Sequence, residues 1–133
     1  MANRNMKILA IDDNQDNLTI IKALVSESFP EAVVFSALNG QTGLQIAFRE
    51  EPDIILLDII MPGMDGFEVC RRLKADPTTA NIPIIMHTAK ENAAALMESR
   101  QLGVVDFVPK DSFSSMVLLG TLKELGVIDQ PGE

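Results

Sequence analysis

Residues 54–66 read IILLDIIMPGMDG, and the first five of them decide the fold class. The run from Ile54 to Leu57 has no alternation of polar and apolar residues, which is typical of a parallel strand covered by helices on both faces. Asp58 follows that run directly. A carboxylate that ends a doubly buried strand loses solvent, which is costly unless some chemistry needs it there. The stretch therefore predicts a central parallel sheet with an acidic group at one strand end.

Four other short apolar runs repeat this pattern along the chain. Their β-branched content predicts five strands in all, at 7–11, 33–37, 54–57, 84–87 and 104–108. The segments between them have helical length and helical spacing of apolar residues. Alternating strands and helices with short connections imply right-handed crossovers and a doubly wound, five-stranded parallel sheet between two layers of helices, an α/β fold. In such sheets ligands bind at the carboxyl ends of the strands.

Length and composition limit the architecture and the partners. A chain of 133 residues, 47% of them hydrophobic, can bury one core, which predicts a single domain with 129–133 as a short tail. No apolar run approaches the roughly 20 residues of a membrane-spanning helix, so we expect a cytoplasmic protein without membrane contacts. The formal net charge of −8 disfavours direct binding to nucleic acid. Cys70, the only cysteine, has no predicted role.

Polar residues follow four of the expected strands, and these strand ends share one edge of the sheet. Asp12 and Asp13 follow the first strand, and Asp58 follows the third. Three carboxylates in a small volume repel one another, and a hard divalent cation such as Mg²⁺ relieves that repulsion. Thr88 and Lys110, at the ends of the last two strands, supply a hydroxyl and a cation suited to a phosphoryl group. The conjunction predicts phosphoryl transfer to Asp58, although each residue alone could be a helix cap or a loop charge.

The same residues carry a resemblance to a known family. The run DIIMPGMDG at 58–66, together with Asp12-Asp13, Thr88-Ala89 and Lys110, resembles the receiver domain of two-component response regulators, the CheY-like domain. The resemblance covers the chain from Lys7 to about Leu125. It implies one receiver domain over 1–128, a flavodoxin-like sheet with strand order 2-1-3-4-5, and a phosphorylated aspartate.

Residue by residue, the resemblance assigns roles to this site. It implies that Asp58 accepts the phosphoryl group, and that Mg²⁺ is bound by Asp12, Asp13, Asp58 and the backbone carbonyl of Ile60, with Asp13 as the usual direct ligand. Thr88 and Lys110 would contact the phosphoryl oxygens, and Phe107 matches the family's aromatic switch position. The receiver would catalyse only its own phosphorylation and dephosphorylation, so it is not expected to be an enzyme with a separate substrate.

The resemblance also implies partners. The phosphoryl donor would be a phosphohistidine on a histidine kinase or a phosphotransfer protein. Phosphorylation would reshape the surface of the fourth helix, fifth strand and fifth helix, which would bind a downstream output protein or domain. The last helix carries more apolar residues than a one-sided core stripe needs, which suits either a homodimer through this surface or deep packing: Phe113, Met116, Val117, Leu118, Leu119, Leu122 and Leu125.

One segment departs from the family pattern. Pro109 precedes Lys110 and Asp111 follows it, whereas many receivers have proline after the lysine. Either a costly cis bond to Asp111 or another loop path would result, so this segment leaves the placement of Lys110 open. Pro109 removes a backbone donor, which an edge strand tolerates. Alternation along the fourth strand predicts that His87 points away from the acidic edge and is structural.

Three other interpretations can be set beside the receiver, and two of them are disfavoured. The first is a pseudo-receiver that binds partners without being phosphorylated, which the unusual segment around Lys110 allows. An aspartyl-phosphate phosphatase is disfavoured because no Asp-x-Asp spacing follows the first strand. An EF-hand starting at Asp12 would need glycine at Asn17 and glutamate at Ala23, and both are missing.

Overall fold

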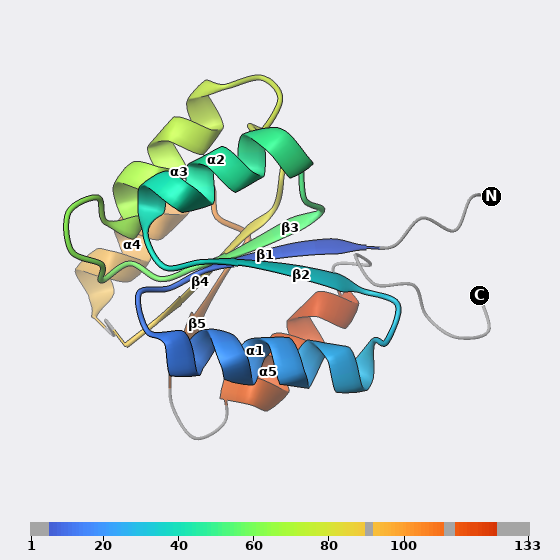
Figure 1. Ribbon diagram of the computed structural model, residues 1–133. Coiled ribbons are helices and arrows are strands. Elements are labelled where there is room, and N and C mark those ends of the chain that lie inside the picture. The colour runs from blue at the N-terminus through green and yellow to red at the C-terminus, as the bar shows by residue number, and fades with distance from the viewer. Residues whose placement is uncertain (1–5, 90–91, 111–113, 125–133) are drawn as a thin grey trace.

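The computed structural model describes residues 6–89, 92–110 and 114–124 (Figure 1). Within them five strands alternate with five helices. The strands are β1 (Lys7–Ile11), β2 (Val33–Ala37), β3 (Ile54–Leu57), β4 (Ile84–Thr88) and β5 (Asp106–Pro109). The helices are α1 (Gln15–Ser28), α2 (Gly40–Glu50), α3 (Gly66–Ala75), α4 (Ala93–Gln101) and α5 (Ser114–Glu124). None of these helices has the length and apolar composition needed to span a bilayer.

The strands form one parallel sheet in the order β2-β1-β3-β4-β5, which confirms the predicted topology. The bounds predicted for the fifth strand, 104–108, were wrong at both ends, because β5 runs from Asp106 to Pro109. Gly103 has a φ of 86°, and the N–H of Val104 donates to the Ser99 carbonyl at 3.2 Å, so both residues belong to the turn that ends α4. Pairing begins with Asp106 opposite Ile85. β4 also runs one residue further than expected, to Thr88.

Helices cover both faces of the sheet, as the unbroken apolar run of β3 predicted. In Figure 1, α1 and α5 lie on one face and α2, α3 and α4 on the other. Alternate residues of β1 point to the two faces: Ile8 and Ala10 pack with α1 and α5, whereas Leu9 and Ile11 pack with α2 and α3. Each fully buried isoleucine or leucine contributes roughly 1.5–3 kcal/mol. Both faces therefore need apolar residues.

Capping side chains fix where the helices begin after the strands. Asn14, Asn39, Asp65 and Asn92 precede α1, α2, α3 and α4, and each side chain accepts a hydrogen bond from a backbone N–H three residues later. Such caps are typically worth about 1 kcal/mol each. They hold the short loops after the strands, which carry the site, at the carboxyl edge of the sheet.

Candidate phosphoryl and metal site

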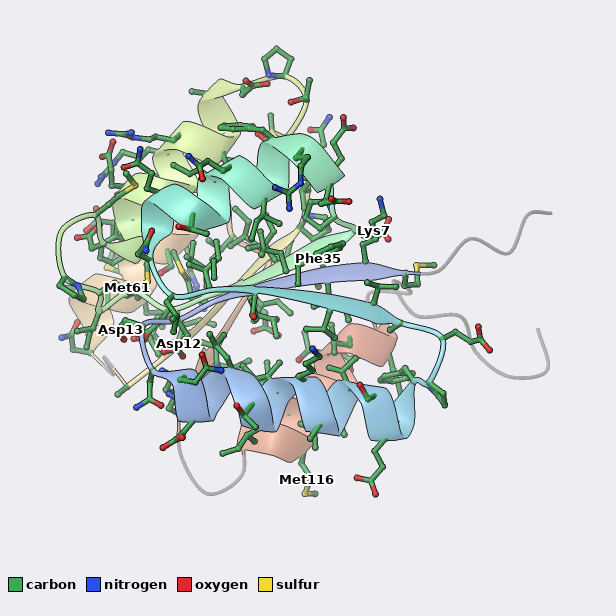
Figure 2. The ribbon with its side chains drawn as sticks, viewed as in Figure 1. Lys7, Asp12, Asp13, Phe35, Met61 and Met116 are labelled. Carbon is green, nitrogen blue, oxygen red and sulfur yellow. The ribbon has the colours of Figure 1, made fainter. Side chains whose placement is uncertain are left out.

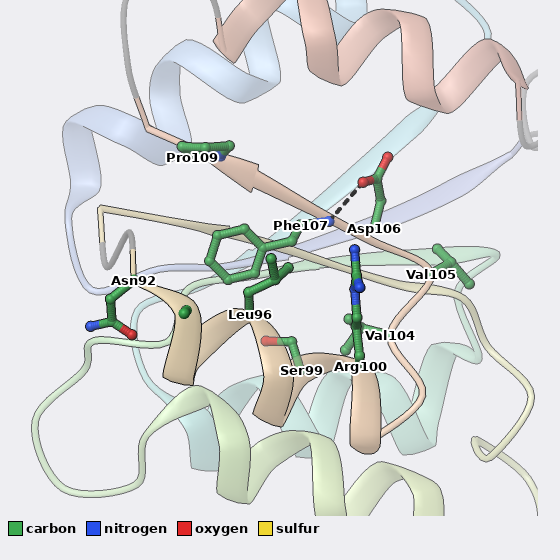
Figure 3. A pocket seen from close by; sticks show the side chains of 10 residues that line it. Asn92, Leu96, Ser99, Arg100, Val104, Val105, Asp106, Phe107 and Pro109 are labelled. Carbon is green, nitrogen blue, oxygen red and sulfur yellow. Dashed lines mark hydrogen bonds between the residues drawn. The ribbon is translucent and has the colours of Figure 1, made fainter.

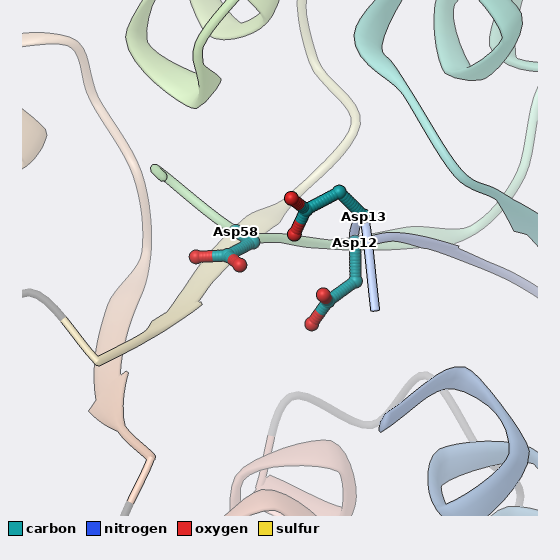
Figure 4. Close-up of side chains that lie close together, drawn as sticks. All are labelled: Asp12, Asp13 and Asp58. Carbon is teal, nitrogen blue, oxygen red and sulfur yellow. The ribbon is translucent and has the colours of Figure 1, made fainter. Parts of the chain in front are cut away.

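Asp12, Asp13 and Asp58 come together at the carboxyl edge of the sheet (Figure 4). One oxygen from each carboxylate lies within 4.8 Å of the other two. Asp12 is 2% exposed and Asp58 is 5% exposed, whereas Asp13 is exposed. In Figure 2, Lys7 marks the start of β1, and Asp12 and Asp13 lie at the other end of that strand. Two buried carboxylates therefore lie beside one that is open to solvent.

Backbone groups of neighbouring residues fix both the main chain and the side chain of Asp58. Its N–H donates to the Ile11 carbonyl at 3.0 Å, which continues the pairing of β3 with β1. Its Oδ1 accepts a hydrogen bond from the N–H of Ile60 at 3.2 Å. A Cβ on Gly66, the first residue of α3, would collide with the Asp58 carbonyl oxygen and with Ile59 Cα. Glycine at this position therefore lets α3 begin directly against the residue that ends β3.

Lys110 connects the two buried carboxylates. Its Nζ lies 2.7 Å from Asp12 Oδ2 and 3.0 Å from Asp58 Oδ2, and its side chain is 19% exposed. Burial lowers the pKa of Lys110, but hydrogen bonds and charges from Asp12 and Asp58 outweigh burial, so the pKa is raised. The loop does place Lys110 in the site despite the departure around Pro109. Asp111 lies outside the described residues, so the geometry of the Lys110–Asp111 bond stays a prediction.

Thr88 lies on β4, the strand beside β3, and Phe107 lies on β5, the next strand outward. Thr88 ends β4 fully buried, and its carbonyl accepts from the N–H of Lys110 at 2.9 Å. Phe107 is half-buried on β5 and lines a groove of about 630 Å³ between α4 and β5 (Figure 3). The N–H of Phe107 donates to Asp106 Oδ1 at 2.8 Å. The roles of Thr88 and Phe107 in a switch stay predictions.

His87 lies under the acidic site, so the expectation that it points away from that edge was wrong. His87 is 7% exposed and borders a narrow gap, too small for a water molecule, together with Asp12 and Asp58. The register explains its position: Leu57 lies opposite Met86, which brings Asp58 level with His87. This position does not show whether His87 has a structural role, so that role stays a prediction.

Reasoning from sequence missed one residue at the site. Asn17, in the first turn of α1, donates from Nδ2 to Asp12 Oδ2 at 3.4 Å. Its spacing of three residues from Asn14, the cap of α1, could have indicated this, because residues three apart lie on the same face of a helix. Asn14 itself donates its N–H to Asp12 Oδ1 at 2.9 Å.

The donor set fits a hard divalent cation. Carboxylate and carbonyl oxygens are the ligands that Mg²⁺ prefers, and three carboxylates converge here. Lys110 and Asn17 engage Asp12, and Lys110 and Ile60 engage Asp58. Among the described residues no hydrogen-bond donor reaches the exposed Asp13 carboxylate, which leaves it the most available ligand.

Comparisons with known proteins agree with this architecture. The family described as "Response regulator receiver domain" matches residues 8–121. The chain is 43% identical over 104 residues to response regulator PleD of Caulobacter vibrioides, covering 78% of this chain and 22% of PleD. It is 33% identical over 104 residues to protein PilH of Pseudomonas aeruginosa, covering 78% of this chain and 84% of PilH. The chain thus spans about a fifth of PleD and most of PilH.

Solved structures show the same fold. Vibrio cholerae chemotaxis protein CheY4 superposes with a TM-score of 0.82 at 26% identity, over 90% of this chain and 98% of CheY4. The phosphorylated cyanobacterial phytochrome response regulator RcpA superposes with a TM-score of 0.77 at 27% identity, over 92% of this chain and 91% of RcpA.

The fold and its acidic edge define a doubly wound α/β domain with a carboxylate site at the carboxyl ends of its strands. The chain belongs to the response regulator receiver domain family. Members of this family act in two-component signalling, and they typically bind Mg²⁺ and are generally not enzymes with a separate substrate.

Proposed function

We propose that this receiver takes a phosphoryl group onto Asp58 from a phosphohistidine of a histidine kinase or phosphotransfer protein. The observation that carries the proposal is the position of Lys110 Nζ, within hydrogen-bond distance of both Asp58 and Asp12. A nucleophilic carboxylate beside a fixed cation has the charge partner that phosphoryl transfer requires. The similarity to RcpA, which is described as phosphorylated, supports the same chemistry.

In the proposed reaction an Asp58 carboxylate oxygen attacks phosphorus. The phosphorus–nitrogen bond of the donor breaks, and the imidazole nitrogen keeps the electron pair. Lys110 then donates to the phosphoryl oxygens, and the Thr88 hydroxyl donates to another of them. Water later attacks phosphorus, releases inorganic phosphate and restores the Asp58 carboxylate. The chain acts on itself in both steps, so it is not an enzyme with a separate substrate.

The site would bind Mg²⁺ through Asp13, Asp58 and the backbone carbonyl of Ile60, with Asp12 beside them. When bound, the cation would neutralise charge on the phosphoryl oxygens. Asp13 is the direct ligand in this proposal because it is exposed, while Lys110 and the start of α1 engage Asp12.

The output surface would be formed by α4, β5 and α5. Exposed Met97, Val105, Met116 and Val117 lie on or beside these elements, and Met116 points away from α5 in Figure 2. Leu118 and Leu122 are buried, so the apolar residues of α5 divide between packing and exposure; Phe113 and Leu125 lie outside the described residues. A downstream protein or domain, or a second copy of this chain, would bind here.

Two further features belong to the proposal. The receiver domain would span 1–128, with the tail at 129–133 outside the described residues. Signalling would take place in the cytoplasm and without direct contact to nucleic acid, in keeping with a net charge of −8.

Intact-mass measurement after incubation with acetyl phosphate and Mg²⁺ tests the proposal. Wild type should gain one phosphoryl group, and Asp58→Asn should gain none. Asp16→Asn, a matched change of an exposed aspartate in α1, should label like wild type. EDTA should abolish the gain. An unlabelled wild type beside a receiver that labels would favour the pseudo-receiver, and labelled Asp58→Asn would show that another residue accepts the group.

A further inference from the structure

Asn17 ties the Asp12 carboxylate to the start of α1. Its Nδ2 donates to Asp12 Oδ2 at 3.4 Å, the oxygen that also accepts from Lys110. Its backbone N–H donates to Asn14 Oδ1 at 3.1 Å, and the N–H of Asn14 donates to Asp12 Oδ1 at 2.9 Å. Both oxygens of Asp12 are therefore connected to the first turn of one helix.

This connection matters because Asp12 is buried. A buried carboxylate is costly unless donors surround it, and only one of these three donors, Lys110, carries a charge. In the proposed reaction Lys110 turns toward the phosphoryl group on Asp58. Asp12 Oδ2 would then lose the hydrogen bond from Lys110, and among the described residues Asn17 would be its remaining donor.

We propose that Asn17 is a positioning residue, which holds the Asp12 carboxylate in the orientation that the Mg²⁺ and phosphoryl site requires. The inference rests on the proposed function of that site. Residues that hydrogen-bond to a metal-site carboxylate change metal affinity by roughly 10–100-fold when removed. Because the Asn17 bond is long and half-buried, we expect a smaller effect for Asn17→Ala, a loss of Mg²⁺ affinity of about 3–10-fold.

The test compares three variants with wild type. Asn17→Ala removes the amide and keeps the helix, because alanine has the highest helix propensity. Asn17→Gln retains an amide donor and should recover most of the affinity. Gln15→Ala is the matched control, since Gln15 lies in the same turn but bonds to Thr19 rather than to Asp12. Mg²⁺ titration by calorimetry gives the Kd, and thermal unfolding without metal gives the Tm.

Asn17→Ala should bind Mg²⁺ about 3–10-fold more weakly than Gln15→Ala, with both variants still folded at the titration temperature as judged by their Tm without metal. Labelling by acetyl phosphate at subsaturating Mg²⁺ should slow in parallel and recover at saturating Mg²⁺. An unchanged Kd in Asn17→Ala, beside a wild type that binds Mg²⁺ and is labelled, would overturn the inference alone. A wild type that neither binds Mg²⁺ nor is labelled would overturn the proposed function and the inference with it.

Discussion

Lys110 Nζ lies closer to Asp12 than to Asp58, at 2.7 Å against 3.0 Å. The lysine therefore contacts the proposed phosphoacceptor while its shorter bond is to the neighbouring carboxylate. A small rotation of the side chain would let it follow a phosphoryl group on Asp58. The same contacts make Lys110 part of the folded structure as well as of the site.

The first prediction concerns the stability that Lys110 provides. We expect Lys110→Met to lower the free energy of unfolding in EDTA by about 1–3 kcal/mol, because two buried carboxylates lose their shared cation. Saturating Mg²⁺ should restore part of the loss. Urea unfolding followed by circular dichroism measures both. Lys22→Met, a change of an exposed lysine in α1, is the control, and equal losses in the two variants would contradict the prediction.

The second prediction is the pH dependence of that contribution. The pKa of Lys110 is raised in the folded protein, because the carboxylates outweigh the opposing effect of burial. A group with a raised pKa stabilises the fold fully below its unfolded pKa of about 10.4, and this contribution is lost as pH rises through the folded pKa. The stability difference between wild type and Lys110→Met should therefore stay constant around neutral pH and shrink only above about pH 10.4. A decline already near neutral pH would argue against it.

The third prediction concerns repulsion among the carboxylates. Asp13 adds a negative charge within 4.8 Å of Asp12 and Asp58. Without metal, Asp13→Asn should raise the free energy of unfolding by less than about 1 kcal/mol, as expected for a solvent-screened charge. With Mg²⁺ the order should reverse, because wild type gains more from the cation. Thermal unfolding with and without Mg²⁺ measures the reversal; Asp16→Asn should not show it.

The fourth prediction concerns the start of α3. Gly66→Ala should destabilise the fold by about 1–3 kcal/mol, because the new methyl group meets backbone atoms of Asp58 and Ile59 that cannot rotate away. It should also slow labelling by displacing Asp58. Gly120→Ala is the matched control: no atom lies within 4 Å of its added Cβ, so alanine should stabilise α5 by about 0.5–1 kcal/mol. Equal signs for the two variants would refute this explanation.

The fold was predictable because its strongest signal is local. The Ile54–Leu57 run is buried throughout, so no polar residue could stand in it, and the sequence shows that directly. The carboxylates were predictable for a related reason, since Asp12 and Asp58 each follow a buried strand immediately. Strand ends on one edge then bring residues together that are far apart in the chain.

What could not be predicted depends on contacts between distant segments. His87 was assigned to the wrong side because its neighbour Thr88 was taken as the reference for the site. Asp12 and Asp58 instead lie on the same side of the sheet as His87 and border the same narrow gap, and only the pairing of β3 with β4 reveals that. The Asn17 bond to Asp12 likewise depends on how α1 leaves the sheet, which the capping pattern alone does not determine.

The outer edge of β5 has a consequence for how this protein meets other molecules. The N–H of Lys110 points inward, to the Thr88 carbonyl of β4. Backbone N–H groups alternate in direction along a strand, so the N–H of Phe107 points outward, away from β4, and Pro109 occupies the next outward position. The Phe107 N–H is already bonded to Asp106, and proline has none. A strand from a second molecule would find no donor at these positions, which disfavours aggregation by sheet extension. Partners that bind along β5 would therefore meet its side chains and carbonyl oxygens rather than free backbone donors at these two positions.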